Sequence, residues 1–414
     1  MSSTRTRTNT GTTTTPSVEP RSADEVVSPL GRPPLRALVI CLLLLVSSVA
    51  WRKGSYFSGS LDIVVIAKAA LSMVALALAA TAPPKGTPWN RFPVGPLPLL
   101  GVYLCITTVG AALYDSGIPT AVLASRVVIV AVTAVFLVHA FPPAQVLTAL
   151  TSAMLLLAGF ASVTGIDSLA TGRLYGGLPP LNANEISLLI SVPLLCLVWR
   201  CVNHRATWMD VAAIAPCLGV IWLTGTRTGL VALLLSVVVI VLMAPRIPAP
   251  MFCAGLLAVP VLLYVVFLTP LISAYATRGD TASVLTLNSR TVAWHAAFDY
   301  AHGLPAQVLG VGLSVKQVPV SAMYRTDQIL DSTWVSAYVQ AGVAGTAVLA
   351  LLVLSTFARV AMSRPQTRSL YTALLLLLAA RSLLESGVFD ATPSGITFLL
   401  VALAIQRPDL QEDP

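Results

Sequence analysis

Three arginines stand in polar breaks between long apolar segments, and each of them could bind an anion. They are Arg173 in the break at 172–177, Arg227 in the break at 224–229 and Arg290 after Asn288-Ser289. A guanidinium group is always protonated and binds phosphate oxygens through two hydrogen bonds, an attraction that the low dielectric near lipid strengthens. Three such side chains in one cavity would suit a lipid-linked phosphate or pyrophosphate. Each arginine alone could instead anchor the chain to lipid headgroups.

Further polar residues near these breaks could line the same cavity. Asn182, Asn184 and Glu185 stand at the start of the apolar segment that follows Arg173. Arg126 lies within an apolar segment, where a charge is costly and needs a partner. We expect Arg126 to be functional if it faces Glu185.

Arg381 and Glu385 are two charged residues one helical turn apart in another apolar segment. Charges within lipid need partners, and residues at positions i and i+4 face each other on a helix. We therefore expect a structural ion pair between them.

The composition of the chain indicates a membrane environment. Of the 414 residues, 56% are hydrophobic and 10% are charged, whereas a soluble domain carries about 25% charged residues. The apolar residues come in runs near membrane length with short polar breaks, which is typical of a polytopic helical membrane protein. A net charge of +8 could suggest nucleic acid or an anionic surface, but the positions of the charges matter more than their sum. We expect no nucleic-acid partner.

The apolar runs predict an all-α fold of about twelve transmembrane helices. Residues 1–34 are predicted to form a disordered cytoplasmic tail, residues 35–406 the transmembrane domain and residues 407–414 a second cytoplasmic tail. Within this domain, residues 271–332 form one long polar loop, and a helical pattern runs from Thr291 to Tyr300. The predicted segments are Leu35–Trp51, Ile63–Ala82, Pro98–Tyr114, Thr120–Phe141, Val146–Gly165, Ile186–Trp199, Val211–Leu223, Gly229–Ala244, Met251–Pro270, Thr333–Phe357, Leu370–Gly387 and Gly395–Ile405.

The distribution of Lys and Arg predicts the orientation of these segments. With the N-terminal tail in the cytoplasm, 14 Lys and Arg residues fall on the inner side and 4 in the short outer loops. Both termini are therefore predicted to be cytoplasmic, and the 271–332 loop extracytoplasmic. The protein would lie in the cytoplasmic membrane, surrounded by lipid, with Arg173 and Arg227 on its outer side.

Several of these positions together resemble the O-antigen ligase and O-antigen polymerase family of bacterial envelope glycosyltransferases. They are Thr226-Arg227-Thr228-Gly229, Arg173 with Gly176 before Asn182-Ala183-Asn184, Arg290 with Trp294, and Gly310-Val311-Gly312. The resemblance covers about residues 173–345. It implies a twelve-helix bundle of the lipid-dependent glycosyltransferase (GT-C) type, with one large external loop between helices nine and ten. It also implies that Arg227 and Arg290 hold the pyrophosphate of a polyprenyl-pyrophosphate glycan as the leaving group.

One motif of the ligase branch is kept in its spacing but not in its first residue. The motif is His, then Asn, Ser or Gln, nine residues, Gly, two residues and a small residue. Here its places are taken by Asp331, Ser332, Gly342 and Gly345. In ligases the histidine is thought to help the acceptor hydroxyl attack. Asp331 could accept the same proton as a general base, or it could pair with Arg227 or Arg290 and hold the cavity together.

The sequence thus predicts an enzyme that transfers or polymerises glycan from a polyprenyl-pyrophosphate donor onto a hydroxyl of a glycan or lipid acceptor, with a polymerase slightly favoured. The residues predicted to line its substrate site are Arg173, Asn182, Asn184, Glu185, Arg126 and Ser332. No metal or cofactor is expected, because the activated bond lies in the lipid substrate, and Gly310–Gly312 is expected to be a turn.

Two other classes of protein would also contain many transmembrane helices. Paired half-chain repeats would favour a transporter or flippase, but residues 35–200 and 211–405 show no convincing self-similarity. A non-catalytic membrane scaffold would keep the helices, yet it gives no reason for the arginines in the outer breaks.

Overall fold

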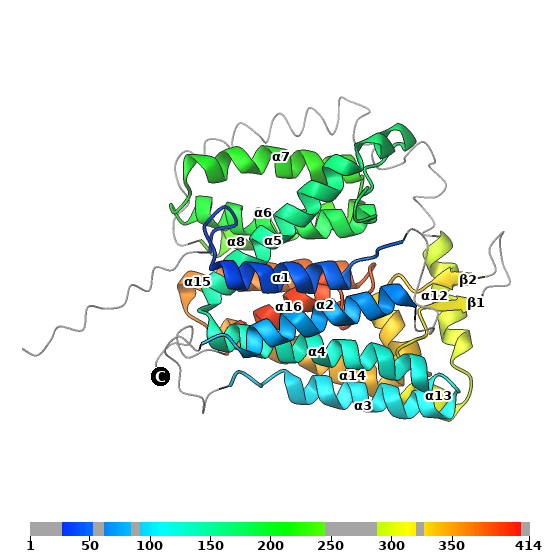
Figure 1. Ribbon diagram of the computed structural model, residues 1–414. Coiled ribbons are helices and arrows are strands. Elements are labelled where there is room, and N and C mark those ends of the chain that lie inside the picture. The colour runs from blue at the N-terminus through cyan, green and yellow to red at the C-terminus, as the bar shows by residue number, and fades with distance from the viewer. Residues whose placement is uncertain (1–26, 53–61, 84–91, 245–287, 320–326, 407–414) are drawn as a thin grey trace, which may run out of the picture.

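The computed structural model describes residues 27–52, 62–83, 92–244, 288–319 and 327–406, and these residues are mostly helical. Five helices are long and apolar enough to cross a membrane, and five shorter apolar helices accompany them in the described part of the chain. Most of the long helices lie side by side as a bundle (Figure 1). Outside the long loop, the described α-helices are α1 Leu35–Ser48, α2 Ile63–Ala80, α3 Leu97–Leu113, α4 Gly117–Ala140, α5 Pro143–Thr164, α6 Ala183–Val202, α7 Trp208–Thr224, α8 Arg227–Leu242, α14 Thr333–Ala361, α15 Pro365–Ser382 and α16 Pro393–Ala404.

Eleven of the twelve predicted apolar segments coincide with these helices, and the predicted segment Met251–Pro270 lies outside the described residues. The helices form because a chain in lipid has no hydrogen-bond partner for its backbone except itself. The chain is therefore a mostly helical, polytopic membrane protein.

Polar side chains cap the helices that begin near the candidate site. Asn182 and Glu185 form a reciprocal capping box at the start of α6, and the Ser332 hydroxyl accepts a hydrogen bond from the Val335 amide at the start of α14. Such caps satisfy amide groups that the helix itself leaves unpaired. They fix where α6 and α14 begin.

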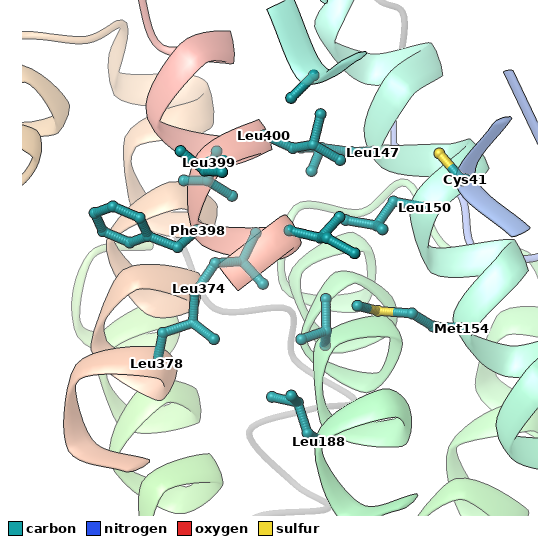
Figure 2. Packing of buried hydrophobic residues seen from close by; sticks show 14 of the residues in the cluster. Cys41, Leu147, Leu150, Met154, Leu188, Leu374, Leu378, Phe398, Leu399 and Leu400 are labelled. Carbon is teal, nitrogen blue, oxygen red and sulfur yellow. The ribbon is translucent and has the colours of Figure 1, made fainter. Parts of the chain in front are cut away.

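The core of the bundle is packed from several helices. Figure 2 shows Leu147, Leu150 and Met154 of α5 pointing toward Leu374 of α15 and Leu400 of α16. All five of these side chains are buried. Lipid tails are as apolar as these side chains, so close packing rather than removal from water holds helices together here.

The described part of the predicted long loop folds at one end of the bundle, where α14 begins (Figure 1). It contains α12 Asn288–Tyr300, which confirms the helical pattern seen in the sequence, and α13 Leu304–Leu309. It also contains β1 Gln317–Pro319 and β2 Asp327–Ile329, which pair antiparallel with Val318 opposite Gln328. This short hairpin is an addition to the mostly helical fold that the sequence predicts.

These loop elements form a small apolar cluster of their own against α14. Ala297 of α12, Val318 of β1 and Leu330 bury their side chains together with Val335 and Val339 of α14. This cluster attaches the loop to the first turns of α14.

The long helix α14 is interrupted at Gly342, whose φ of +63° and ψ of −166° are not helical. The interruption frees two carbonyl groups, and the Gly310–Gly312 turn fills the gap. The Val311 amide donates to the Val339 carbonyl at 2.9 Å, and the Gly312 amide donates to the Gln340 carbonyl at 3.0 Å. The expectation that Gly310–Gly312 is a turn is confirmed.

The predicted N-terminal tail falls within the described residues from Val27 onwards. There the Ser28 amide donates to the Thr148 hydroxyl at 3.0 Å, and the Ser152 hydroxyl donates to the Pro29 carbonyl at 2.8 Å. Residues 27–29 therefore lie against α5. Residues 1–26 and 407–414 lie outside the described residues.

Candidate functional site

Arg227 is the first residue of α8, after the N-cap Thr226 and the left-handed Gly225. The Arg227 side chain is half-buried, and its Nε atom is buried without a hydrogen-bond partner in the described part of the chain. A buried polar group left unpaired costs free energy, so this nitrogen is suited to an acceptor atom on a ligand. The start of a helix also favours a negative charge, because its amide groups point outward.

Arg173, in the loop before α6, packs against the turn that leads to Arg227. The Arg173 Nε donates to the Thr224 carbonyl at 3.0 Å, and its guanidinium stands 5.6 Å from the centre of the Tyr175 ring. The next residue of the loop, Leu174, donates its amide to the Leu223 carbonyl at 2.9 Å. The loop that carries Arg173 is therefore held against the α7–α8 turn, and two of the three predicted arginines meet at that turn.

Arg381 of α15 is buried beside this turn, with 3% of its surface exposed. Its Nη1 donates to the Ser187 hydroxyl at 3.4 Å, its Nη2 donates to the Asn184 carbonyl at 2.7 Å, and Nη2 also pairs with Glu385. A Cβ atom on Gly229 would lie 2.6 Å from Arg381 Nη1, so the first turn of α8 packs directly on this guanidinium. The predicted ion pair between Arg381 and Glu385 is confirmed, and we call these two residues the Arg381–Glu385 pair.

The Arg381–Glu385 pair also holds the start of α14. The Glu385 carbonyl accepts hydrogen bonds from the Thr333 amide at 3.1 Å and from the Thr333 hydroxyl at 2.7 Å. Ser332 is buried as the N-cap of α14, and Asp331, just before it, is exposed. Through the side chain of Arg381 and the backbone carbonyl of Glu385, the Arg227 turn and the Asp331–Thr333 turn pack against the same end of α15, although these turns are about a hundred residues apart in the sequence.

The other predicted lining residues divide into two groups. Asn182 and Glu185 use their side chains in the capping box of α6, with the Glu185 amide donating to Asn182 Oδ1 at 2.9 Å. Arg126 of α4 donates to the Ser47 carbonyl of α1 at 3.2 Å. The expected approach of Arg126 to Glu185 stays a prediction.

Arg290 lies in the first turn of α12, and its side chain is outside what the structure describes. One turn later, Trp294 packs against the small loop cluster, and its Nε1 atom is buried without a hydrogen-bond partner. The predicted meeting of Arg290 with Arg173 and Arg227 thus stays a prediction.

An apolar groove of about 500 Å³ lies beside the Arg227 turn. It is lined by Leu218, Gly219, Trp222 and Leu223 from α7 and by Leu230 from α8. Leu230 is three residues from Arg227, so a ligand with a charged head and an apolar tail could contact both.

Sequence reasoning missed that Ser187 and Gly229 belong to this site. The sequence features that could have indicated them were local. Gly229 ends the Thr226–Gly229 motif, and Ser187 is a polar residue near the start of an apolar helix. Neither feature shows that both residues meet Arg381.

A comparison with protein families matches residues 212–350 to the family described as O-antigen ligase. The matched stretch includes Arg227, Arg290 and Asp331, and it ends within α14 after Gly342 and Gly345. A comparison with curated proteins finds no match.

Proposed function

We propose that this chain, whose residues 212–350 match the O-antigen ligase family, transfers or polymerises glycan from a polyprenyl-pyrophosphate donor onto a hydroxyl acceptor. The reaction would take place on the outer face of the cytoplasmic membrane, with both termini of the chain in the cytoplasm. Polymerisation is favoured, because Asp331 stands where the ligase motif has histidine.

The observation that carries this proposal is the unpartnered Nε of Arg227, placed at a helix start beside a second arginine and an apolar groove. A pyrophosphate offers oxygen acceptors and negative charge to the arginines. A polyprenyl tail offers apolar surface to the groove. A polyprenyl-pyrophosphate glycan combines both features in one molecule.

In the proposed reaction, a hydroxyl oxygen of the acceptor attacks the anomeric carbon of the donor sugar with inversion. The bond between that carbon and the phosphate oxygen breaks, and polyprenyl pyrophosphate leaves with the electron pair. Arg227 and Arg290 stabilise the negative charge that develops on this leaving group. No metal or cofactor is part of the proposal, because the donor already carries the activated bond.

Asp331 has two proposed roles. Its carboxylate accepts the proton from the acceptor hydroxyl as a general base, or it pairs with Arg227 or Arg290 and keeps the cavity together. Its exposed position at the start of α14 gives an acceptor access to it. Kinetics of Asp331→Asn separate these roles: loss of a base lowers kcat, and loss of an arginine partner raises the KM for the donor.

The overall proposal is tested by incubating the purified protein, in lipid vesicles, with a polyprenyl-pyrophosphate oligosaccharide. Chain growth or transfer to an acceptor supports the proposed enzyme. Movement of the lipid between leaflets without a new glycosidic bond would instead indicate a flippase. A protein that does neither would be a scaffold.

Substituting Gly219 by leucine is expected to fill the apolar groove and weaken the binding of long-chain donors. A Cβ atom at Gly219 meets no other atom within 4 Å, so the larger side chain enters open space and leaves the fold intact. We expect the KM for a long polyprenyl donor to rise, because the leucine side chain occupies the space in which the lipid tail would pack against α7 and α8. The KM for a donor with a short lipid tail should stay the same.

Gly159→Leu on α5 is the matched control, because a Cβ atom at Gly159 also meets nothing within 4 Å. If Gly219→Leu and Gly159→Leu give the same KM for the long-chain donor, the groove does not hold the lipid tail.

A further inference from the structure

Glu385 has a second carboxylate oxygen that binds none of the residues described by the structure. Its Oε2 pairs with Arg381, whereas its Oε1 is buried without a hydrogen-bond partner among those residues. The side chain is 16% exposed, so little water reaches it. Leaving a carboxylate oxygen unpaired in such a place costs free energy, which a ligand carrying a hydrogen-bond donor would recover.

The position of Glu385 lies between the parts of the site that the proposed reaction uses. Its ion-pair partner Arg381 packs on the first turn of α8, which begins with Arg227. Its own carbonyl holds Thr333, two residues after Asp331. A substrate held at Arg227 and attacked near Asp331 would therefore pass by Glu385.

The charges around Glu385 determine which part of a substrate it can meet. The carboxylate of Glu385 repels a pyrophosphate, so the phosphate groups belong at the arginines. A sugar hydroxyl is neutral and donates a hydrogen bond, which matches the unpaired acceptor of Glu385.

We propose that Glu385 Oε1 accepts a hydrogen bond from a hydroxyl group of the glycan, while Arg381 holds the carboxylate in place. This inference rests on the proposed function for the identity of the ligand. It makes Glu385 a substrate-contacting residue that distinguishes a glycan-bearing lipid from the bare lipid pyrophosphate.

The test compares the binding of two probes to the full-length protein in vesicles: undecaprenyl pyrophosphate and the same lipid carrying an oligosaccharide. Glu385→Gln keeps the shape of the side chain but removes its charge, and a hydrogen bond to a charged group is stronger than one to a neutral group by about tenfold in affinity. We expect Glu385→Gln to lower the affinity for the glycan-bearing probe about tenfold and the affinity for the bare probe less than about twofold. Arg227→Ala should lower the affinity for both probes.

Two further variants separate binding from folding. Asp210→Asn breaks the buried Arg200–Asp210 ion pair, which lies at the other end of α6, and should lower thermal stability without changing the ratio of the two affinities. Glu385→Asp keeps the charge but shortens the side chain, and should lower only the affinity for the glycan-bearing probe.

The proposal is overturned if Glu385→Gln leaves both affinities unchanged, or if it weakens both probes equally, since the latter marks a purely structural residue. Because the readout is binding, it does not depend on turnover. An inactive wild-type protein would refute the proposed enzyme, whereas an unchanged affinity ratio in an active protein would refute only the role of Glu385.

Discussion

Replacing Arg227 by alanine is expected to lower glycan transfer by about a thousandfold while leaving the amount of folded protein unchanged. Loss of a single fixed donor that stabilises developing negative charge typically costs a factor of about 10²–10³ in kcat, and Arg227 would also bind the donor in its ground state. The fold should tolerate the change because the Nε of this side chain forms no hydrogen bond with any residue that the structure describes. The measurement is polymer formation by purified protein, with protein abundance determined by immunoblot.

Arg227→Lys and Arg52→Ala provide controls for this experiment. Lysine keeps the charge but cannot bind two oxygens in one plane, so its activity should fall between those of the wild type and the alanine variant. Arg52 forms an exposed ion pair with Asp62, and its removal should have little effect. We expect Arg290→Ala to resemble Arg227→Ala. Full activity in both alanine variants would show that these arginines do not hold the pyrophosphate.

The helices of this protein could be predicted from sequence because an apolar run of membrane length has few backbone conformations other than a helix open to it in lipid. The errors of this prediction concern the residues at which helices begin and end, and they have local causes. The segment predicted as Leu370–Gly387 is α15 at Pro365–Ser382 in the structure. Arg368 in its first turn hides the true start, and the apolar residues Leu383 and Leu384 continue the hydrophobic run beyond the true end.

The site could be predicted only in part because its contacts join distant residues. The sequence showed that Arg381 and Glu385 face each other on one helix. The contacts from Arg381 to Ser187 and Asn184 span 194 and 197 residues, and no periodicity of a single segment contains them. The sequence could therefore identify a structural ion pair, but it could not show that this pair lies between Arg227 and Asp331.

The spacing of the motif at 331–345 has a physical explanation that the sequence did not provide. Ser332 caps α14, and Gly342 interrupts the same helix after nine residues. The interruption receives a turn from thirty residues earlier in the chain, at Gly310–Gly312. A glycine in an apolar segment is common, so its effect becomes visible only when its partner is known.

Replacing Gly342 by alanine is therefore expected to destabilise the protein by about 3 kcal/mol or more, a value that combines backbone strain with overpacking. The φ of +63° and ψ of −166° at this position belong to a region that only glycine adopts readily. An added Cβ atom would also overlap the backbone of Val308, which cannot move away as a flexible side chain would. The turn at Gly310–Gly312 would be displaced, and with it the support of α14 near Asp331.

Thermal unfolding of the detergent-solubilised variants measures this effect, and glycan transfer by the fraction that remains folded measures its consequence for the site. Gly159→Ala is the matched control, since a Cβ atom there meets nothing within 4 Å in the middle of a regular helix. Alanine is a better helix former than glycine, so this control should be neutral or more stable by about 0.5–1 kcal/mol. Equal unfolding temperatures for Gly342→Ala and Gly159→Ala would show that α14 does not require its interruption. A lower temperature for Gly342→Ala alone, together with reduced transfer by its folded fraction, would show that the break in α14 holds the start of this helix in the geometry that the site uses.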